Sequence, residues 1–299
     1  MKVFVTGATG FIGSAIVPEL INAGHKVLGL TRSDAGAKSL AAAGAEVHRG
    51  DLEDLESLRS GAAKSDGVIH TAFNHDFSNF KANCETDRRV IDALGSALVG
   101  SERRLIVTSG TGMVGASSGR PAREEDAPES GPNAIPRVAT EEAAAALAAK
   151  GVNISLMRLP QVHDPVKQGL VTYLVAIARE KGMSAFVGDG EKRWPAAHRL
   201  DVARLYRLAL EKGLAGARYH AVAEEGVPCK DIAEVIGRGL NVPVVSMPPA
   251  EAANHFGWLA MFASLDLPAS STQTQESLGW RPTGPGLITD LKAMDYSAK

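Results

Sequence analysis

A run of glycines close to the N-terminus carries the clearest chemical signal in this sequence. The motif Thr6-Gly-Ala-Thr-Gly-Phe-Ile-Gly13 follows an apolar segment and precedes a segment of helical composition. Glycines at a spacing of three allow backbone conformations that other residues avoid and let the chain approach a ligand closely. The N–H groups that open the helix then face an anion. The motif therefore predicts a turn that seats the pyrophosphate of a dinucleotide. The predicted contacts are Gly7, Thr9, Gly10, Phe11, Ile12 and Gly13.

The residues after the second expected strand indicate which dinucleotide is bound. A site that prefers NAD usually places a carboxylate there for the ribose 2′-hydroxyl. This chain has Thr31, Arg32 and Ser33 instead. A guanidinium pairs with phosphate oxygens through two N–H groups at once. The sequence therefore favours NADP(H) over NAD(H) as the cofactor. In the alternative interpretation, Arg32 is a solvated loop residue and Asp34 reaches the ribose.

Length, charge and cysteine content narrow the classes of protein. The 299 residues carry 32 basic and 34 acidic side chains, a net charge of -2, without a long run of either sign. This balance indicates neither nucleic acid nor an anionic membrane as a partner. No signal peptide or long apolar run is evident, which predicts a cytoplasmic protein. Cys84 and Cys229 lie far apart and form no ligand pattern, so we expect buried or half-buried thiols and no metal site.

Short apolar runs alternate with helical segments along the chain. This alternation is typical of an α/β protein with a Rossmann-type, doubly wound parallel sheet. The expected strands cover residues 2–6, 26–31, 46–49, 67–70, 104–108 and 153–158. The expected helices cover residues 35–43, 52–59, 80–98 and 139–150.

After the sixth expected strand, frequent prolines interrupt shorter helices. We interpret this part as a smaller lobe that closes one wall of a substrate cleft. The predicted organisation is a dinucleotide-binding core over residues 1–160, with core elements returning around 184–222, and a mainly substrate-binding lobe over 161–299.

An ordered set of motifs resembles the short-chain dehydrogenase/reductase superfamily, specifically its extended or atypical branch, the NAD-dependent epimerase/dehydratase-like proteins. Besides the glycine motif, the set contains Gly50-Asp-Leu52, His70-Thr-Ala72, Val107-Thr-Ser-Gly110, Arg158-Leu-Pro-Gln-Val162, Gly188-Asp-Gly190, His198-Arg-Leu-Asp-Val-Ala203 and Leu278-Gly-Trp-Arg-Pro282. The resemblance implies that Asp51 and Leu52 border the adenine. It places Thr71, Ala72 and Phe73 along the nicotinamide ribose, and Pro160 and Val162 at the nicotinamide. It also implies a homodimer that pairs the helices around 82–98 and 139–150.

The catalytic residues of that superfamily do not recur here. Its members normally use a Tyr-x-x-x-Lys pair and an upstream serine, whereas none of the four tyrosines here is followed by lysine at that spacing. Alignment of Thr140 with the small residue before the usual lysine puts Arg137 at the tyrosine position and Glu141 at the lysine position. The two form either a replacement active site or an i,i+4 ion pair on a helix surface. Gly110 occupies the serine position, between Ser109 and Thr111.

Another side chain would then have to supply the proton. The candidates are Ser109, Thr111, His163, Tyr173 and His198, together with His75, Asp76 and Asp87 after the fourth expected strand. A histidine near its ordinary pKa can donate a proton at neutral pH. Because His163 follows the strand that ends beside the nicotinamide in the family, we rank it above His198. In the alternative, His198 caps the following helix.

Two functions from different classes agree with these features. One is an NADP(H)-dependent oxidoreductase that transfers a hydride to or from a small carbonyl or alcohol substrate, with a non-standard proton donor. The other is a non-catalytic NADP(H)-binding redox sensor. A nucleotide-sugar epimerase or dehydratase ranks third, because those reactions also depend on the missing tyrosine and lysine.

Overall fold

A computed structural model describes residues 1–114, 119–129 and 134–297 of the chain. Within these residues, a seven-stranded sheet has the order β10-β6-β5-β4-β1-β2-β3. Every pairing in this sheet is parallel. Its strands are β1 Lys2–Thr6, β2 Lys26–Thr31, β3 Glu46–Arg49, β4 Gly67–His70, β5 Arg104–Gly110, β6 Ile154–Leu159 and β10 Arg218–His220. The order reverses direction between β1 and β4, which makes their carboxyl ends the switch point of a doubly wound sheet.

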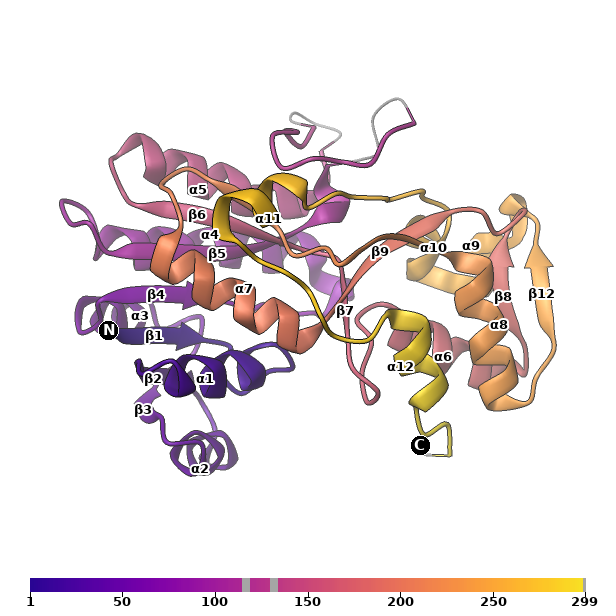
Figure 1. Ribbon diagram of the computed structural model, residues 1–299, viewed down its shortest axis with the longest axis horizontal. Helices are drawn as coiled ribbons and strands as arrows, with labels where there is room; N and C mark the ends of the chain where they lie inside the picture. The colour runs from indigo at the N-terminus through magenta and orange to yellow at the C-terminus, as the bar shows by residue number, and fades with distance from the viewer. Residues whose placement is uncertain (115–118, 130–133, 298–299) are drawn as a thin grey trace.

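Helices cover both faces of this sheet, as Figure 1 shows. One apolar core joins α1 and α7 to the sheet, and a second joins α3, α4 and α5 to its other face. The bounds are α1 Gly13–Asn22, α2 Asp34–Ala42, α3 Leu55–Ala63, α4 Phe80–Ser96, α5 Ala139–Ala149 and α7 Arg199–Lys212. The short 3-10 helices of this part are η1 Phe77–Asn79, η2 Thr111–Met113 and η3 Pro136–Val138.

Most of the remaining elements form a lobe with a core of its own, at the right of Figure 1. One of its small sheets has the order β11-β9-β7 and the other pairs β12 with β8. The strands are β7 Gln161–His163, β8 Ser184–Val187, β9 Arg193–His198, β11 Glu224–Pro228 and β12 Val244–Met247. The helices of the lobe are α6 Val171–Lys181, α8 Cys229–Leu240, η4 Pro249–Glu251, α9 Ala252–Phe256, η5 Gly257–Leu259, α10 Ala260–Ala263 and α12 Leu287–Ala293. Helix α11 Thr272–Leu278 packs instead against β10 and α7 of the main part, and its Leu278 lies in the same core as α1.

The predicted α/β class with a Rossmann-type parallel sheet is confirmed. The predicted helix over 52–59 is wrong at both ends, since α3 covers Leu55–Ala63. The Asp51 carboxylate accepts hydrogen bonds from the backbone N of Glu53 and Asp54, which closes a turn before the helix. Asp54 then caps α3 by accepting from the backbone N of Ser57.

The chain returns from the lobe to the main sheet through α7 and β10, within the predicted 184–222 segment. The earlier strands of that segment, β8 and β9, belong to the small sheets. The division into a core over 1–160 and a lobe over 161–299 stays a prediction. Both cysteine thiols are buried, as expected. Among the described residues, no helix combines the length and apolar character needed to cross a lipid bilayer.

Candidate cofactor and active site

The glycine turn has a backbone conformation and close contacts that leave no room for a Cβ atom on Gly7 or Gly13. Gly7 has φ +67°, and a Cβ there would lie 2.7 Å from the amide N of Ala72. A Cβ on Gly13 would lie only 2.0 Å from the carbonyl O of Gly7. The amide N of Gly10 donates to that same carbonyl O at 2.9 Å. The turn therefore packs against both the start of α1 and the residues after β4, and leaves the closely approachable backbone that a pyrophosphate needs.

The predicted adenosine contacts lie at the ends of β2 and β3. Thr31 is buried, while Arg32 and Ser33 are exposed. The Ser33 hydroxyl caps α2 by accepting from the backbone N of Gly36 at 3.0 Å. Asp34 forms an ion pair with Arg49 at 2.5 Å. Two arginines and one paired carboxylate thus lie at the ends of these two strands.

The predicted adenine and nicotinamide contacts differ in exposure. Asp51 is exposed and Leu52 half-buried. Thr71, Ala72 and Phe73 follow β4 and are half-buried, which leaves part of each side chain accessible beside the glycine turn. Pro160 is half-buried between β6 and β7. Val162 is buried in the core that also contains α1 and α7.

Arg137, at the expected tyrosine position, is part of a buried polar network. Its guanidinium pairs with Asp87 at 2.6 Å, donates to the carbonyl O of Thr108 at 3.0 Å and stacks on the Phe73 ring at 3.8 Å. Asp87 also accepts from the Nε2 atom of His70 and from the Thr140 hydroxyl. Burial by itself raises the pKa of Asp87, but the Arg137 charge and these hydrogen bonds outweigh it and lower the pKa to about 2. The pair is therefore ionised at neutral pH.

Glu141, at the expected lysine position, belongs to a different network. Its two carboxylate oxygens accept from Nε and Nη2 of Arg158 at 2.9 and 2.7 Å. Ser109 donates its hydroxyl hydrogen to the same carboxylate at 2.9 Å. The side chains of Arg158 and Glu141 are 0% and 4% exposed. The predicted alternative of a surface ion pair between Arg137 and Glu141 is wrong, because each has a buried partner elsewhere.

His220 completes this second network. Its Nδ1 atom lies 2.8 Å from the carbonyl O of Ser270, which can only accept, so the hydrogen is on Nδ1. Its Nε2 atom then accepts from the Arg158 guanidinium at 3.2 Å. Burial, and then the nearby Arg158 charge, lower the pKa of His220 to about 4.

We expect this histidine to make the fold sensitive to mild acid. In the unfolded chain it binds a proton near pH 6.5, and in the folded chain only near pH 4, so stability falls as the pH drops between these values. The loss amounts to roughly 3 kcal/mol for a shift of this size. Urea unfolding at pH 4.5 to 7.5 should show a smaller dependence on pH for His220→Gln. An equal dependence in the variant and the wild type would contradict this.

The sequence-predicted proton donors lie in different surroundings. Ser109 is buried against Glu141, and the Thr111 hydroxyl is directed to the carbonyl O of Leu159. The Nδ1 atom of His163 lies 2.7 Å from Asp290, and the ring is 0% exposed. His198 caps α7 through Nδ1, as the alternative interpretation predicted. The catalytic role of each of these residues stays a prediction.

Tyr173, the fifth predicted donor, is part of an exposed aromatic group. We call Phe73, Phe77, Tyr173 and Trp258 the ring cluster. The Phe77 and Trp258 rings stack at 4.2 Å, and Tyr173 meets Trp258 edge-on at 5.1 Å. His75 links Phe73 to Phe77 through contacts with both rings. Tyr173 and Trp258 are 38% and 43% exposed. The ring cluster therefore forms an apolar surface where the segment after β4 meets the lobe.

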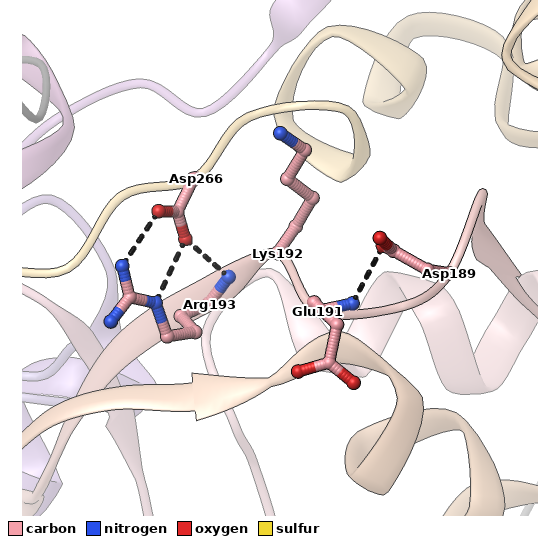
Figure 2. Close-up of a pocket in the computed structure, with 5 residues that line it drawn as sticks. All are labelled: Asp189, Glu191, Lys192, Arg193 and Asp266. Atoms are coloured by element: carbon pink, nitrogen blue, oxygen red, sulfur yellow. Dashed lines mark hydrogen bonds and ion pairs between the residues drawn. The ribbon is translucent and has the colours of Figure 1, made fainter. Parts of the chain in front are cut away.

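Figure 2 shows a charged pocket of about 410 Å³ in the lobe. Arg193 and Asp266 in its wall neutralise each other through two side-chain hydrogen bonds. The pocket lies at the Arg193 end of β9. The other end of β9 is His198, and the next residue, Arg199, lies over the ring of Phe11 in the glycine turn. Five residues of strand span roughly 16 Å, so the pocket is separate from the glycine turn.

Sequence reasoning did not assign a role to His70, Arg158 or His220. A partial signal exists, because Asp87 shares a helical spacing with the buried residues Cys84, Ile91 and Leu94. Arg158 similarly interrupts an apolar strand. A charge on a buried face requires a partner. The sequence does not reveal which residue provides it.

Together, the doubly wound parallel sheet and the glycine turn at its switch point define a dinucleotide-binding α/β protein. The model of the NAD dependent epimerase/dehydratase family matches residues 3–222. The chain belongs to this family, within the extended short-chain dehydrogenase/reductase superfamily.

Known proteins resemble the chain over most of its length. An uncharacterized protein of Schizosaccharomyces pombe is 49% identical and covers 99% of this chain and 100% of its own. The 2-alkyl-3-oxoalkanoate reductase of Stenotrophomonas maltophilia is 29% identical over 82% of this chain and 77% of its own. The UDP-glucose 4-epimerase of Thermus thermophilus, solved with NAD, superimposes with a TM-score of 0.77 at 21% identity over 100% and 99% of the two chains.

Proposed function

We propose that this protein is an NADP(H)-dependent reductase of a small, apolar carbonyl compound. Bound NADPH supplies the hydride for such a reaction. The observation that carries the proposal is the glycine turn, in which a Cβ on Gly7 or Gly13 would occupy space within 3 Å of backbone atoms. Such a turn fits a dinucleotide pyrophosphate, and the family's enzymes are NAD-dependent.

The ring cluster supports an apolar substrate. Its aromatic side chains come from the segment after β4 and from α6 and η5 of the lobe, and two of them are more than one-third exposed. A sugar nucleotide would need polar and basic groups there for its hydroxyls and diphosphate. The reductase from Stenotrophomonas maltophilia acts, by its name, on an alkyl oxo acid, which also has an apolar part.

A redox sensor is the second candidate. The observation that favours it is the loss of the Tyr-x-x-x-Lys pair, whose positions hold Arg137 and Glu141 in buried ion pairs. An epimerase or dehydratase ranks third, because it needs the same missing pair. As a further proposal, the chain forms a homodimer through the exposed faces of α4 and α5.

The test is NADPH oxidation at 340 nm with benzaldehyde, cinnamaldehyde and 9,10-phenanthrenequinone. NADPH and NADH binding would be titrated in parallel by calorimetry. Turnover of an aromatic carbonyl compound would support the reductase. Tight NADPH binding without turnover of any compound would favour the sensor.

The preference for NADP(H) gives a separate prediction. Because Arg32 is exposed at the end of β2, we expect it to pair with the 2′-phosphate. Arg32→Ala should raise the Kd of NADPH about tenfold, the effect of losing one charge-assisted contact, and leave that of NADH unchanged. Asp34→Asn is the control, since it tests whether the carboxylate reaches the ribose. If Asp34→Asn weakens the binding of NADH but not that of NADPH, the result would favour NAD(H) as the cofactor.

A further inference from the structure

The Phe73 side chain connects Arg137 to the residues that pack against the glycine turn. Ala72 contacts the turn, since its amide N lies 2.7 Å from the position of a Cβ on Gly7. Phe73 is the next residue, and the Arg137 guanidinium carbon lies 3.8 Å from the centre of its ring. Arg137 also bonds to the carbonyl O of Thr108 in β5. It is therefore fixed near the carboxyl ends of β4 and β5, against the Phe73 ring of the ring cluster.

The guanidinium has hydrogen-bonding capacity to spare. Arginine carries five N–H donors. In the part of the chain that the structure describes, one donates to Asp87 and one to the carbonyl O of Thr108. The side chain is 12% exposed, and its other N–H donors make no hydrogen bond to the described residues. The ion pair with Asp87, whose own side chain is 2% exposed, keeps the guanidinium from turning away.

Resting on the function proposed above, we propose that Arg137 is a catalytic residue that binds the carbonyl oxygen of the substrate. In the reduction, the hydride from NADPH forms a new C–H bond at the carbonyl carbon, and the electron pair of the C=O π bond moves to the oxygen. The spare N–H donors of Arg137 stabilise the charge that develops there. The alkoxide takes its proton from water. Arg137 keeps its own proton throughout, because arginine does not deprotonate in proteins.

This role predicts a characteristic pH profile. The titratable groups that face Arg137 are Asp87 and Cys84 on α4, His75 after β4 and Tyr206 on α7. Asp87 has a pKa of about 2, and burial raises the pKa of the Cys84 thiol to about 11 and that of Tyr206 above its ordinary value. Burial, with the Arg137 charge, lowers the pKa of His75. None of these groups changes charge between pH 7 and 10, so kcat should be constant over that range.

The experiment compares Arg137→Met with Arg137→Lys and with the double variant Arg137→Met/Asp87→Asn. Arg137→Lys keeps a positive charge beside Asp87, and the double variant removes both charges of the pair. The experiment therefore still gives a result if Arg137→Met by itself fails to fold. Arg59→Met is the matched control, because Arg59 makes an exposed ion pair with Glu56 on α3, away from the proposed dimer helices. Three quantities are measured: kcat with the best carbonyl compound of the panel, the Kd of NADPH, and the Kd of cinnamate, whose carboxylate imitates the alkoxide.

We expect each folded Arg137→Met variant to lose at least about 100-fold in kcat, as enzymes do when one oxyanion donor is removed. Its affinity for cinnamate should fall about tenfold, its affinity for NADPH should stay within threefold, and Arg137→Lys should be intermediate. A folded variant with unchanged kcat and cinnamate affinity would overturn the inference, as would a wild-type kcat that falls tenfold per pH unit above pH 7. Absence of carbonyl turnover in the wild type would refute the proposed reductase, while the cinnamate titration would still decide whether Arg137 binds an oxyanion.

Discussion

Gly13→Ala is expected to weaken NADPH binding by at least 100-fold, about 2.8 kcal/mol. The alanine Cβ would lie 2.0 Å from the carbonyl O of Gly7 and 2.9 Å from the Cα of Ala8. Both neighbours are backbone atoms, so no side-chain rotation relieves the overlap. The turn must move away from the start of α1, and its N–H groups then no longer converge on the pyrophosphate. Calorimetric titration of NADPH measures the change.

Gly112→Ala is the control for this variant. Gly112 lies in η2, and the nearest atom to its Cβ would be a methyl carbon of Leu267 at 3.9 Å, an ordinary contact. NADPH affinity in this control should stay within threefold of the wild type. A Gly13→Ala protein that binds NADPH as tightly as the control would show that the dinucleotide does not use this turn.

Glu141→Gln is expected to lower the free energy of unfolding by ~3–5 kcal/mol, because it leaves the Arg158 charge buried without its counter-ion. The Arg158 side chain is 0% exposed and makes two hydrogen bonds to this carboxylate. In urea unfolding, the midpoint should shift strongly at neutral pH. We expect the thermal midpoint to fall by roughly 5–10 °C.

The adjacent residue of α5 provides a matched control. Glu142 carries the same side chain, is 48% exposed and pairs with Arg88 on the surface. Glu142→Gln should cost less than about 1 kcal/mol, as exposed ion pairs usually do. The double variant Glu141→Met/Arg158→Met should be more stable than Glu141→Gln, since it leaves no charge unpaired. Equal effects of Glu141→Gln and Glu142→Gln would contradict the importance of the buried network.

These two neighbouring glutamates illustrate what tertiary contacts add. In the sequence both follow Thr140 in an alanine-rich helical segment, and nothing nearby distinguishes them. In the fold, Glu141 lies on the face of α5 that meets β5 and β6, where Arg158 and Ser109 reach it. Glu142 lies toward α4 and solvent. The difference depends on residues 17 and more positions away along the chain.

The sequence by itself determined the features that depend on local conformation. The glycine spacing, the alternation of apolar and helical segments and the strand ends follow from backbone preferences and hydrophobic patterning, which act within a few residues. For this reason β1 to β4 have the predicted bounds, and the Rossmann-type sheet could be expected before any contact was known. The resemblance to the superfamily, and not these local preferences, placed Arg137 and Glu141 at the positions of the missing tyrosine and lysine.

Only the tertiary structure decided which charges meet. Arg137 pairs with Asp87, which is 50 residues away in the sequence, and His220 bonds to Arg158, which is 62 residues away. Such pairings depend on which strand ends lie side by side and which helix faces are buried. A charge that is buried must be paired or solvated, but several partners satisfy that need equally well in the sequence. The packing of the sheet, α4 and α5 selects one of them.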